Sequence, residues 1–233
     1  MSVDPLRPSA ESSRGAAAPV AAPLDPRPVA LIRLAALAQN LRDAREAGFA
    51  VVDRDVLSAD AWGHGAGIVE RAVSSAGMAW ADSGRAGALG GARLFGLPGS
   101  SGRPVMTLTG RVIMTKLLRR GEGVSYGYTF RAPSDTTIAL VRGGYGQGIV
   151  RRLGNRVAVR VEGRDAPVVG RVAMDVCVVD LGPRGTVSPG APAVFFGDPD
   201  QGEPALGSWT AATGLSADEI VAIVGVAARR ETS

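Results

Sequence analysis

The spacing of apolar residues changes near residue 100, and this change limits the folds open to the chain. Before it, short apolar runs alternate with segments of helical spacing, as where Val29–Ile32 is followed by leucines at 34, 37 and 41. After it, apolar and polar residues alternate as in strands, and residues 157–169 have the pattern of a hairpin. The sequence therefore predicts an α+β fold whose C-terminal part is mainly β-sheet.

We expect three segments along the chain. Residues 1–28 are dominated by Ala, Pro, Ser and Arg, which predicts a disordered leader. Residues 29–102 contain two strand–helix units and end in a loose joint rich in Gly, Ala and Ser. Residues 103–233 are expected to form a β-domain.

Particular elements can be placed within these segments. Strands are expected at 29–32 and 50–52, each followed by a helix, the second of them over 67–76. Ser216 and Glu219 have capping-box spacing before an apolar run, so the last helix is predicted to start at Ser216.

Composition narrows the classes of site and the compartment. With 233 residues and 45% apolar content, the chain is long enough to bury a core, and it contains no run of about 18 apolar residues that would span a bilayer. No secretory signal is recognisable, so we expect a cytoplasmic protein without a membrane anchor. His64 and Cys177 are the only histidine and the only cysteine, so no metal site is expected and Cys177 is predicted to be a buried strand thiol.

The positive charge comes almost entirely from arginine. The net charge is +4, and 25 arginines accompany a single lysine, Lys116. Three arginine pairs, at 119–120, 151–152 and 229–230, could meet phosphates, because a guanidinium offers a planar fork of donors. Since neither a nucleic-acid-binding module nor a series of stacking aromatics accompanies them, a basic polyanion-binding module stays only as an alternative.

Four motifs occur one after another in the second half of the chain. They are Pro104–Leu108 (PVMTL), Gly121–Gly127 (GEGVSYG), Gly144–Gly148 (GYGQG) and Val169–Asp175 (VGRVAMD). Together they resemble the C-terminal β-domain of alanine racemases. The resemblance implies that this part folds as the β-barrel of that family.

The first half resembles the same family at Ser58–Gly65, with the sequence SADAWGHG. The family motif begins with the lysine that holds pyridoxal phosphate, whereas this chain has Ser58 there and Trp62 at a phosphate-binding tyrosine. A serine hydroxyl cannot form a Schiff base with the cofactor. An alternative alignment places Asp53 at the lysine position, and it supplies no amine either.

The family resemblance also implies an N-terminal (β/α)8 barrel, for which the chain is too short. Such a barrel needs about 250 residues, and only about 75 lie between Val29 and the joint. In the alignment, Leu89 stands where an arginine faces the cofactor ring, and Val226 stands where a tyrosine binds its phosphate. We therefore expect a remnant of the barrel, with no cofactor-binding residues and no cofactor in the chain alone.

By resemblance, the β-domain keeps the residues that the family presents to a second subunit in a head-to-tail dimer. Tyr126 corresponds to the tyrosine that acts as one catalytic base, while Met174, Asp175 and Tyr145 correspond to residues near the substrate. A tyrosine has a reference pKa of about 10, so it acts as a base only where its surroundings favour the phenolate.

These observations lead to one preferred function and two alternatives. The preferred hypothesis is a degenerate, non-catalytic racemase-like protein whose β-domain binds or complements a racemase barrel. The partner would be either a second copy of this chain in a homodimer or a full-length racemase. The first alternative is a racemase of alanine or another small amino acid, in D-alanine metabolism, completed by a second chain with Tyr126 as one base. The second alternative is the polyanion-binding module.

Overall fold

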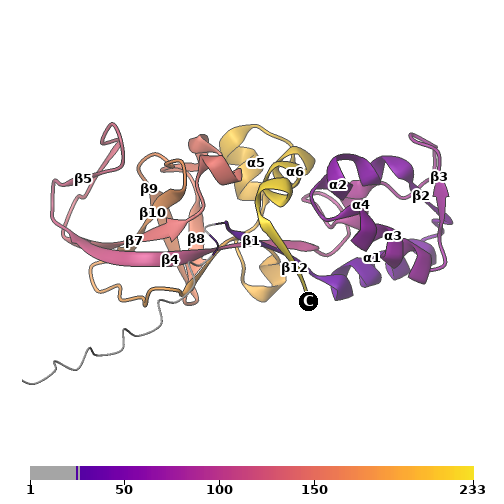
Figure 1. Cartoon of the computed structure of the whole chain (residues 1–233), viewed down its shortest axis with the longest axis horizontal. Coiled ribbons are helices and arrows are strands. Elements are labelled where there is room, and N and C mark those ends of the chain that lie inside the picture. The colour runs from indigo at the N-terminus through magenta and orange to yellow at the C-terminus, as the bar shows by residue number, and fades with distance from the viewer. Residues whose placement is uncertain (1–24, 26) are drawn as a thin grey trace, which may run out of the picture.

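The computed structural model describes Asp25 and residues 27–233. Nearly all of the predicted leader, residues 1–28, lies outside the described residues. The remaining chain forms an elongated body in which a β-barrel at one end joins a group of helices at the other (Figure 1). The predicted α+β class, with a mainly β C-terminal part, is confirmed.

Six antiparallel strands close the barrel. In sequence order they are β4 (Met106–Leu118), β7 (Thr136–Arg142), β8 (Ala158–Val161), β9 (Arg164–Val169), β10 (Val176–Gly182) and β11 (Pro192–Phe196). Their order around the barrel is β4-β7-β10-β9-β8-β11, and β11 pairs again with β4. β4 can close the ring because it is 13 residues long, so that its first half pairs with β11 and its second half with β7.

The expected hairpin and C-terminal helix are both present. β8 and β9 pair across a turn at Glu162 and Gly163, which both have positive φ, as a tight two-residue hairpin turn requires. Helices α5 (Gly207–Thr213) and α6 (Ala217–Ala227) follow the barrel. α6 begins after Ser216, whose backbone N–H and hydroxyl both donate to the Glu219 carboxylate, at 2.8 and 2.9 Å.

The first strand is followed by a helix, as expected, but its partners lie in the barrel sheet rather than in the N-terminal half. β1 (Val29–Ile32) pairs antiparallel with β4 and parallel with the last strand, β12 (Arg229–Thr232). The short apolar run of β1 predicts a strand but contains no information about which sheet the strand joins. Through β1, the N-terminal half of the sequence thus contributes a strand to the sheet of the C-terminal half. The domain boundary expected near residue 102 stays a prediction.

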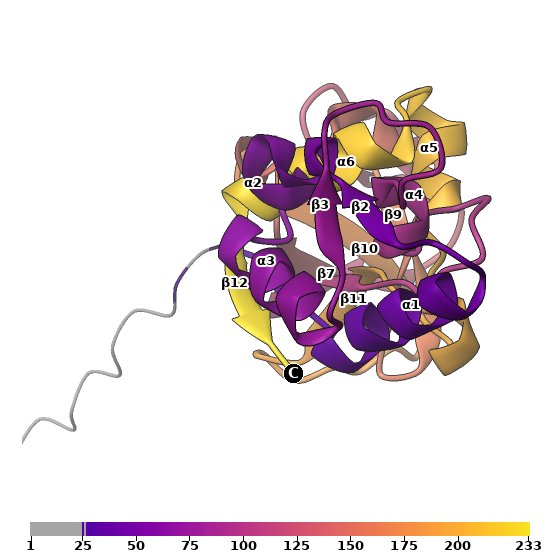
Figure 2. The same cartoon turned by 90° about the vertical axis from the view of Figure 1, so that its right-hand side faces the viewer.

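The helical end contains short parallel strands. α1 (Leu34–Glu46) leads to β2 (Val51–Asp53), and α2 (Ser58–Trp62) and α3 (Ala66–Ser75) lead to β3 (Ala79–Ala81). β3 pairs parallel with β2, and Leu89 forms a parallel bridge on the other side of β2. Figure 2 shows β2 and β3 at this end of the molecule, flanked by α1 and α3. This end thus consists of parallel strands among helices, and its origin as a remnant of a (β/α) barrel stays a prediction.

The segment predicted as a loose joint is packed, which corrects that expectation. Leu89, Leu94 and Phe95 are fully buried, and residues 91–94 form the short helix α4 (Gly91–Leu94). The buried Asn40 of α1 donates to the carbonyl oxygens of Leu94 and Arg103 at 2.9 and 2.8 Å. Small residues permit close approach here: a Cβ on Gly96 would lie 1.9 Å from the Arg103 oxygen.

Candidate functional site

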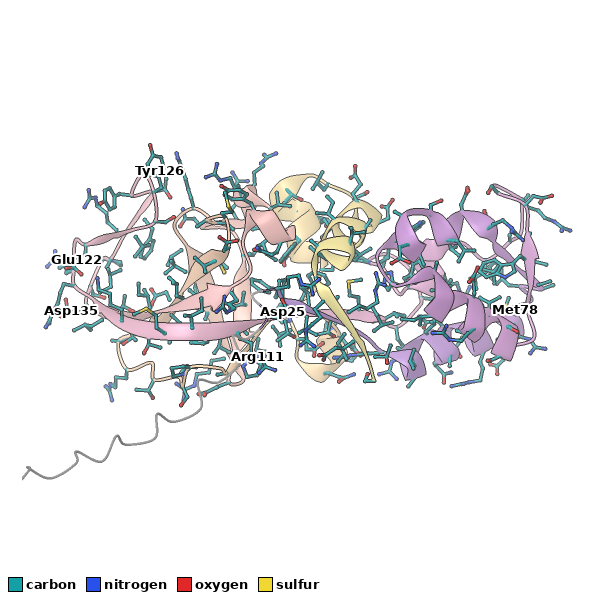
Figure 3. The ribbon with its side chains drawn as sticks, in the orientation of Figure 1. Asp25, Met78, Arg111, Glu122, Tyr126 and Asp135 are labelled. Carbon is teal, nitrogen blue, oxygen red and sulfur yellow. The ribbon has the colours of Figure 1, made fainter. Side chains whose placement is uncertain are left out.

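A two-stranded finger extends from the far end of the barrel. β5 (Gly123–Val124) pairs with β6 (Phe130–Arg131), and the turn between them has positive φ at Ser125, Gly127 and Tyr128. The Ser125 hydroxyl fixes the base of this turn by donating to the Arg171 carbonyl oxygen at 2.5 Å. Tyr126 lies at the tip, with 83% of its surface exposed (Figure 3).

A hollow of about 340 Å³ lies beside the finger and brings predicted site residues together. Tyr126, Tyr145 and Met174 all line it, although they come from three separate parts of the sequence. Tyr145 is 38% exposed and Met174 55% exposed, which is unusual for side chains of this size and apolarity. The fold therefore gathers three of the four predicted site residues around one surface hollow.

Two arginines that were not among the predicted site residues also line this hollow. The Arg151 guanidinium lies 4.5 Å from the centre of the Tyr145 ring, a cation–π arrangement. Arg171 lines the hollow and lies close to the finger turn, since a Cβ on Gly127 would be 3.2 Å from its Nη1 atom. Its place inside the VGRVAMD motif is a sequence signal that could have identified it. The sequence around Arg151 indicates only a possible phosphate contact.

Asp175, the fourth predicted residue, holds the turn next to the hollow. Its carboxylate accepts from Gln147 Nε2 at 2.9 Å, and Gln147 Oε1 accepts from the Gly144 N–H at 2.9 Å. Gly144 packs against the chain beside Asp175, because a Cβ there would lie 2.3 Å from the Met174 oxygen. In this geometry Asp175 fixes the position of Tyr145, which follows Gly144 directly.

The SADAWGHG segment at the other end adopts an unusual backbone. Four consecutive residues, 59–62, have φ between 48° and 56°, so α2 is a left-handed turn built without glycine. For L-residues this costs roughly 1–2 kcal/mol each, so surrounding contacts must hold it in place. Asp60 supplies two of them, because it accepts from the Ala66 N–H at 2.8 Å and pairs with Arg230 at 2.6 Å. These contacts also hold the pKa of the Asp60 carboxyl below its usual value.

A glycine pair presses the same segment against α6. A Cβ on Gly63 would lie 2.6 Å from the Val221 oxygen, and a Cβ on Gly225 would lie 2.5 Å from the Gly63 oxygen. Arg230 adds a hydrogen bond from its Nε to the Gly63 oxygen at 3.1 Å. The segment is thus part of the contact between the helical end and the C-terminal helix.

His64 is buried in this contact and stacks on Phe95, with ring centres 4.0 Å apart and planes 5° from parallel. Burial lowers the pKa of His64 to about 4, and the charge of Arg230 acts in the same direction. The ring is therefore neutral at pH 7.

The described residues do not fit pyridoxal phosphate bound in the family manner. Ser58 is exposed and carries no amine, and Lys116 is an exposed residue on β4, outside the motif. The Trp62 ring packs against Gly91, where a Cβ would lie 2.5 Å from the indole. Val226, at the position of a phosphate-binding tyrosine, is 65% exposed and has no polar side-chain atom. No amine, ring-nitrogen partner or phosphate hydroxyl is available where the cofactor would need them.

The finger and the SADAWGHG segment lie at opposite ends of the molecule. Figure 1 places β5 at one end and α2 with the other helices at the other, and Figure 3 shows Tyr126 far from Met78 of the helical end. A general base must come within about 2.6–3.2 Å of the proton it removes. Tyr126 is therefore too far from the SADAWGHG segment of its own chain to exchange a proton there.

The remaining side chains singled out from sequence have structural surroundings. Cys177 is buried in β10, as predicted, and burial raises the pKa of its thiol to about 12. In the part of the chain that the structure describes, no three His, Cys, Asp or Glu residues gather as a metal site would require.

The arginine pairs are partly used within the fold. Arg119 pairs with Asp135 at 2.9 Å, Arg229 pairs with Glu231, and Arg152 donates to the Thr213 oxygen at 3.1 Å. These contacts occupy donors that a phosphate would need, and binding to nucleic acid stays an untested alternative.

Among the described helices, none is by itself both long and apolar enough to cross a membrane. α5 and α6 reach that length and composition only when taken together across a bend of 102°.

Comparison with known proteins assigns the second half of the chain. Residues 105–232 match the family model described as "Alanine racemase, C-terminal domain". The alanine racemase of Streptomyces coelicolor is 45% identical over 132 residues, which are 56% of this chain and 34% of that protein. The matched part thus spans about a third of the length of the curated relatives.

Solved structures extend the likeness to the first half at the level of the fold. A crystal structure of the Streptomyces coelicolor alanine racemase superposes with a TM-score of 0.78 at 23% identity, covering 89% of this chain and 98% of that one. A histidine racemase from Leuconostoc mesenteroides gives 0.72 at 14% identity, covering 91% and 99%.

The two kinds of coverage together show that this chain is shorter than the relative that it matches. If 132 residues are 34% of the Streptomyces protein, that protein has about 390 residues, so a 233-residue chain can reach across 98% of it only by omitting an internal stretch. With the family model matching more than half of its residues, the chain belongs to the alanine racemase family.

Proposed function

We propose that this protein is a racemase-like binding module, without catalytic activity by itself, that docks the finger side of its barrel onto the barrel of a racemase subunit. The observation that carries the proposal is the exposure of Tyr126, Tyr145 and Met174 around one hollow. A cluster of exposed apolar and aromatic side chains on a folded protein is typical of an interaction surface.

The chemistry of the helical end supports the non-catalytic part of the proposal. Exchange of an amino acid's α-proton through pyridoxal phosphate requires an amine to hold the cofactor and bases on both faces of the bound substrate. Ser58 replaces that amine, and Trp62 fills the space beside Gly91. On the finger side, by contrast, the tyrosines Tyr126 and Tyr145 and the carboxylate Asp175 are all present.

Sedimentation velocity tests the docking. The protein is mixed with the full-length alanine racemase of Streptomyces coelicolor, and a faster-sedimenting mixed species is expected. Tyr126→Ala should weaken the complex by at least about fivefold, because truncating a central interface aromatic commonly costs more than 1 kcal/mol. Leu34→Ala, which removes a half-exposed leucine from the helical end, is the matched control and should leave it unchanged. Separate sedimentation of the two proteins at all concentrations would contradict the proposal.

A second candidate, a racemase completed in trans, is favoured by the free position of Tyr126 at the finger tip. The test adds this protein to a racemase whose own catalytic tyrosine has been replaced and follows the conversion of L-alanine to D-alanine. A gain in rate that disappears with Tyr126→Phe would support the second candidate. If the complex forms but the rate does not increase, only the binding-module function remains supported.

A further inference from the structure

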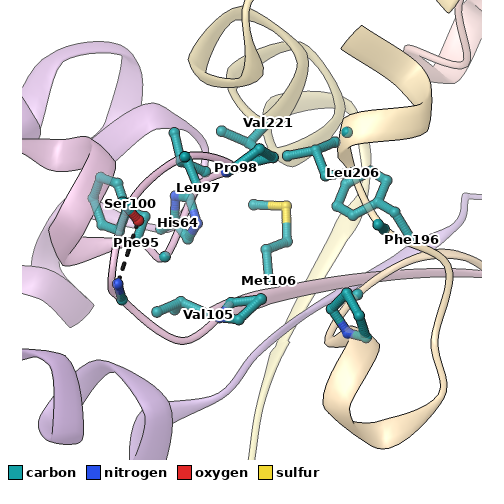
Figure 4. Close-up of a pocket in the computed structure, with 18 residues that line it drawn as sticks. His64, Phe95, Leu97, Pro98, Ser100, Val105, Met106, Phe196, Leu206 and Val221 are labelled. Atoms are coloured by element: carbon teal, nitrogen blue, oxygen red, sulfur yellow. Dashed lines mark hydrogen bonds between the residues drawn. The ribbon is translucent and has the colours of Figure 1, made fainter. Parts of the chain in front are cut away.

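A pocket of about 250 Å³ lies where the helical end meets the barrel, on a different side of the protein from the finger. It is bounded by the SADAWGHG segment, the loop after α4, the start of β4, the end of β11 and helices α5 and α6 (Figure 4). Most of its side chains are apolar, among them Phe95, Leu97, Val105, Met106, Phe196 and Leu206. No charged side chain lines it, so the pocket is unsuited to an amino acid or a phosphate.

His64 is the one ionisable side chain in the wall, and its hydrogen-bonding state can be assigned from its neighbours. Nδ1 lies 3.0 Å from the Ala61 oxygen and 3.1 Å from the Trp62 oxygen. Because carbonyl oxygens only accept, Nδ1 must carry the proton of the neutral ring. Nε2 is then a bare acceptor, and it is buried without a partner.

We propose that this pocket binds a small, mainly apolar molecule of one or two rings that carries one hydrogen-bond donor. Because Nε2 of His64 has less than 1 Å² of accessible surface, the proposal includes a small movement of the pocket wall that lets Nε2 accept from that donor. The size follows from the volume, since an apolar cavity of about 150 Å³ holds benzene and this pocket is larger. The donor follows from His64, because a buried acceptor without a partner loses free energy that a donor would recover. The low pKa of His64 keeps the acceptor available at neutral pH.

The probe is indole, whose ring N–H can only donate, and the matched ligand is indene, which has similar size and no N–H. Binding is followed by NMR in protein with labelled methionine methyl groups, because the Met106 side chain reaches into the pocket (Figure 4). Indole is expected to shift the Met106 methyl resonance saturably and to leave that of Met174, beside the finger, unchanged. No shift of Met106 up to the solubility limit of indole would overturn the proposal.

The hydrogen bond is tested by replacing the acceptor while keeping a ring. His64→Phe preserves stacking on Phe95 and removes Nε2, so the preference for indole over indene should fall by about fivefold relative to the original protein, a change typical of one hydrogen bond. An unchanged preference would overturn the assigned role of His64.

A measurement on the unaltered protein covers the case in which His64→Phe does not fold. His64 is the only histidine, so its Nε2 signal in a ¹⁵N spectrum needs no assignment by mutation. Indole should move that signal upfield as the lone pair accepts a hydrogen bond. A shifted Met106 methyl with an unmoved Nε2 signal would exclude the hydrogen bond, and with it the proposed ligand class.

Discussion

The finger and the SADAWGHG segment both resemble parts of a racemase active site, but the fold treats them in opposite ways. Tyr126 and Met174 stay largely exposed at the barrel end, whereas His64 and Gly63 of the other motif are buried against α6 and the loop after α4. The difference suggests a physical rule. Side chains that contact another molecule must remain outside the core, whereas a motif can also be kept because its residues pack against other elements.

The largest effect is expected for the buried SADAWGHG segment, whose His64 should make the protein less stable in mild acid. The unfolded chain binds a proton at His64 below about pH 6.5, and the folded chain does so only below about pH 4. The free energy of unfolding should therefore fall by about 3 kcal/mol between pH 6.5 and pH 4, with the full stability present above pH 6.5.

Urea unfolding at several pH values measures this dependence. His64→Phe is the matched variant, because it keeps the ring stack and cannot titrate. Between pH 6.5 and pH 4, the free energy of unfolding of this variant should fall by about 3 kcal/mol less than that of the original protein. Equal slopes for the two proteins would show that His64 is not held neutral in the folded state.

A smaller effect is expected at the glycine contact between α2 and α6. Gly225→Ala should lower the free energy of unfolding by about 2 kcal/mol, because the added methyl would meet the Gly63 backbone, even though alanine favours a helix. Thermal and urea unfolding both measure the change.

Gly207→Ala is the matched control for this substitution. Gly207 also lies in a helix, and a Cβ there has no atom within 4 Å, so stability should stay the same or rise slightly. If the two variants are equally stable, the close contact between the helical end and α6 is absent in solution.

The smallest effect on stability is expected for the exposed finger. Tyr126→Ala should change the free energy of unfolding by less than about 0.5 kcal/mol, because the side chain has little packing to lose. Phe130→Ala, in the same finger, should cost about 1 to 2 kcal/mol, because Phe130 packs against the buried cluster around Leu118 and Val124. A large loss of stability in Tyr126→Ala would contradict its assignment as a binding residue.

Several elements could be predicted from the sequence because their signals are local. The hairpin at 157–169 has the alternation and the Glu162–Gly163 turn that produce it, and the capping residues Ser216 and Glu219 mark the start of α6. Local composition was misleading at residues 83–102. Glycines there permit close packing with Trp62 and with Arg103, which a sequence pattern cannot distinguish from looseness.

The candidate site shows the same division. Motif order identified Tyr126, Tyr145, Met174 and Asp175 as a group, but the hollow that joins three of them also contains Arg151 and Arg171. Those two arginines are 20 residues apart, and only the folding of the barrel brings both to Tyr145 and Met174.

The sequence by itself determined the family of the second half and the lack of an amine at Ser58, because both depend only on which residues occur in which order. The tertiary structure decided that β1 joins the barrel sheet, that Tyr126 and the SADAWGHG segment face opposite ends, and that His64 lines an apolar pocket. Those features depend on contacts between residues far apart in the chain. Such contacts follow from how whole elements pack together, and no local run of residues encodes them.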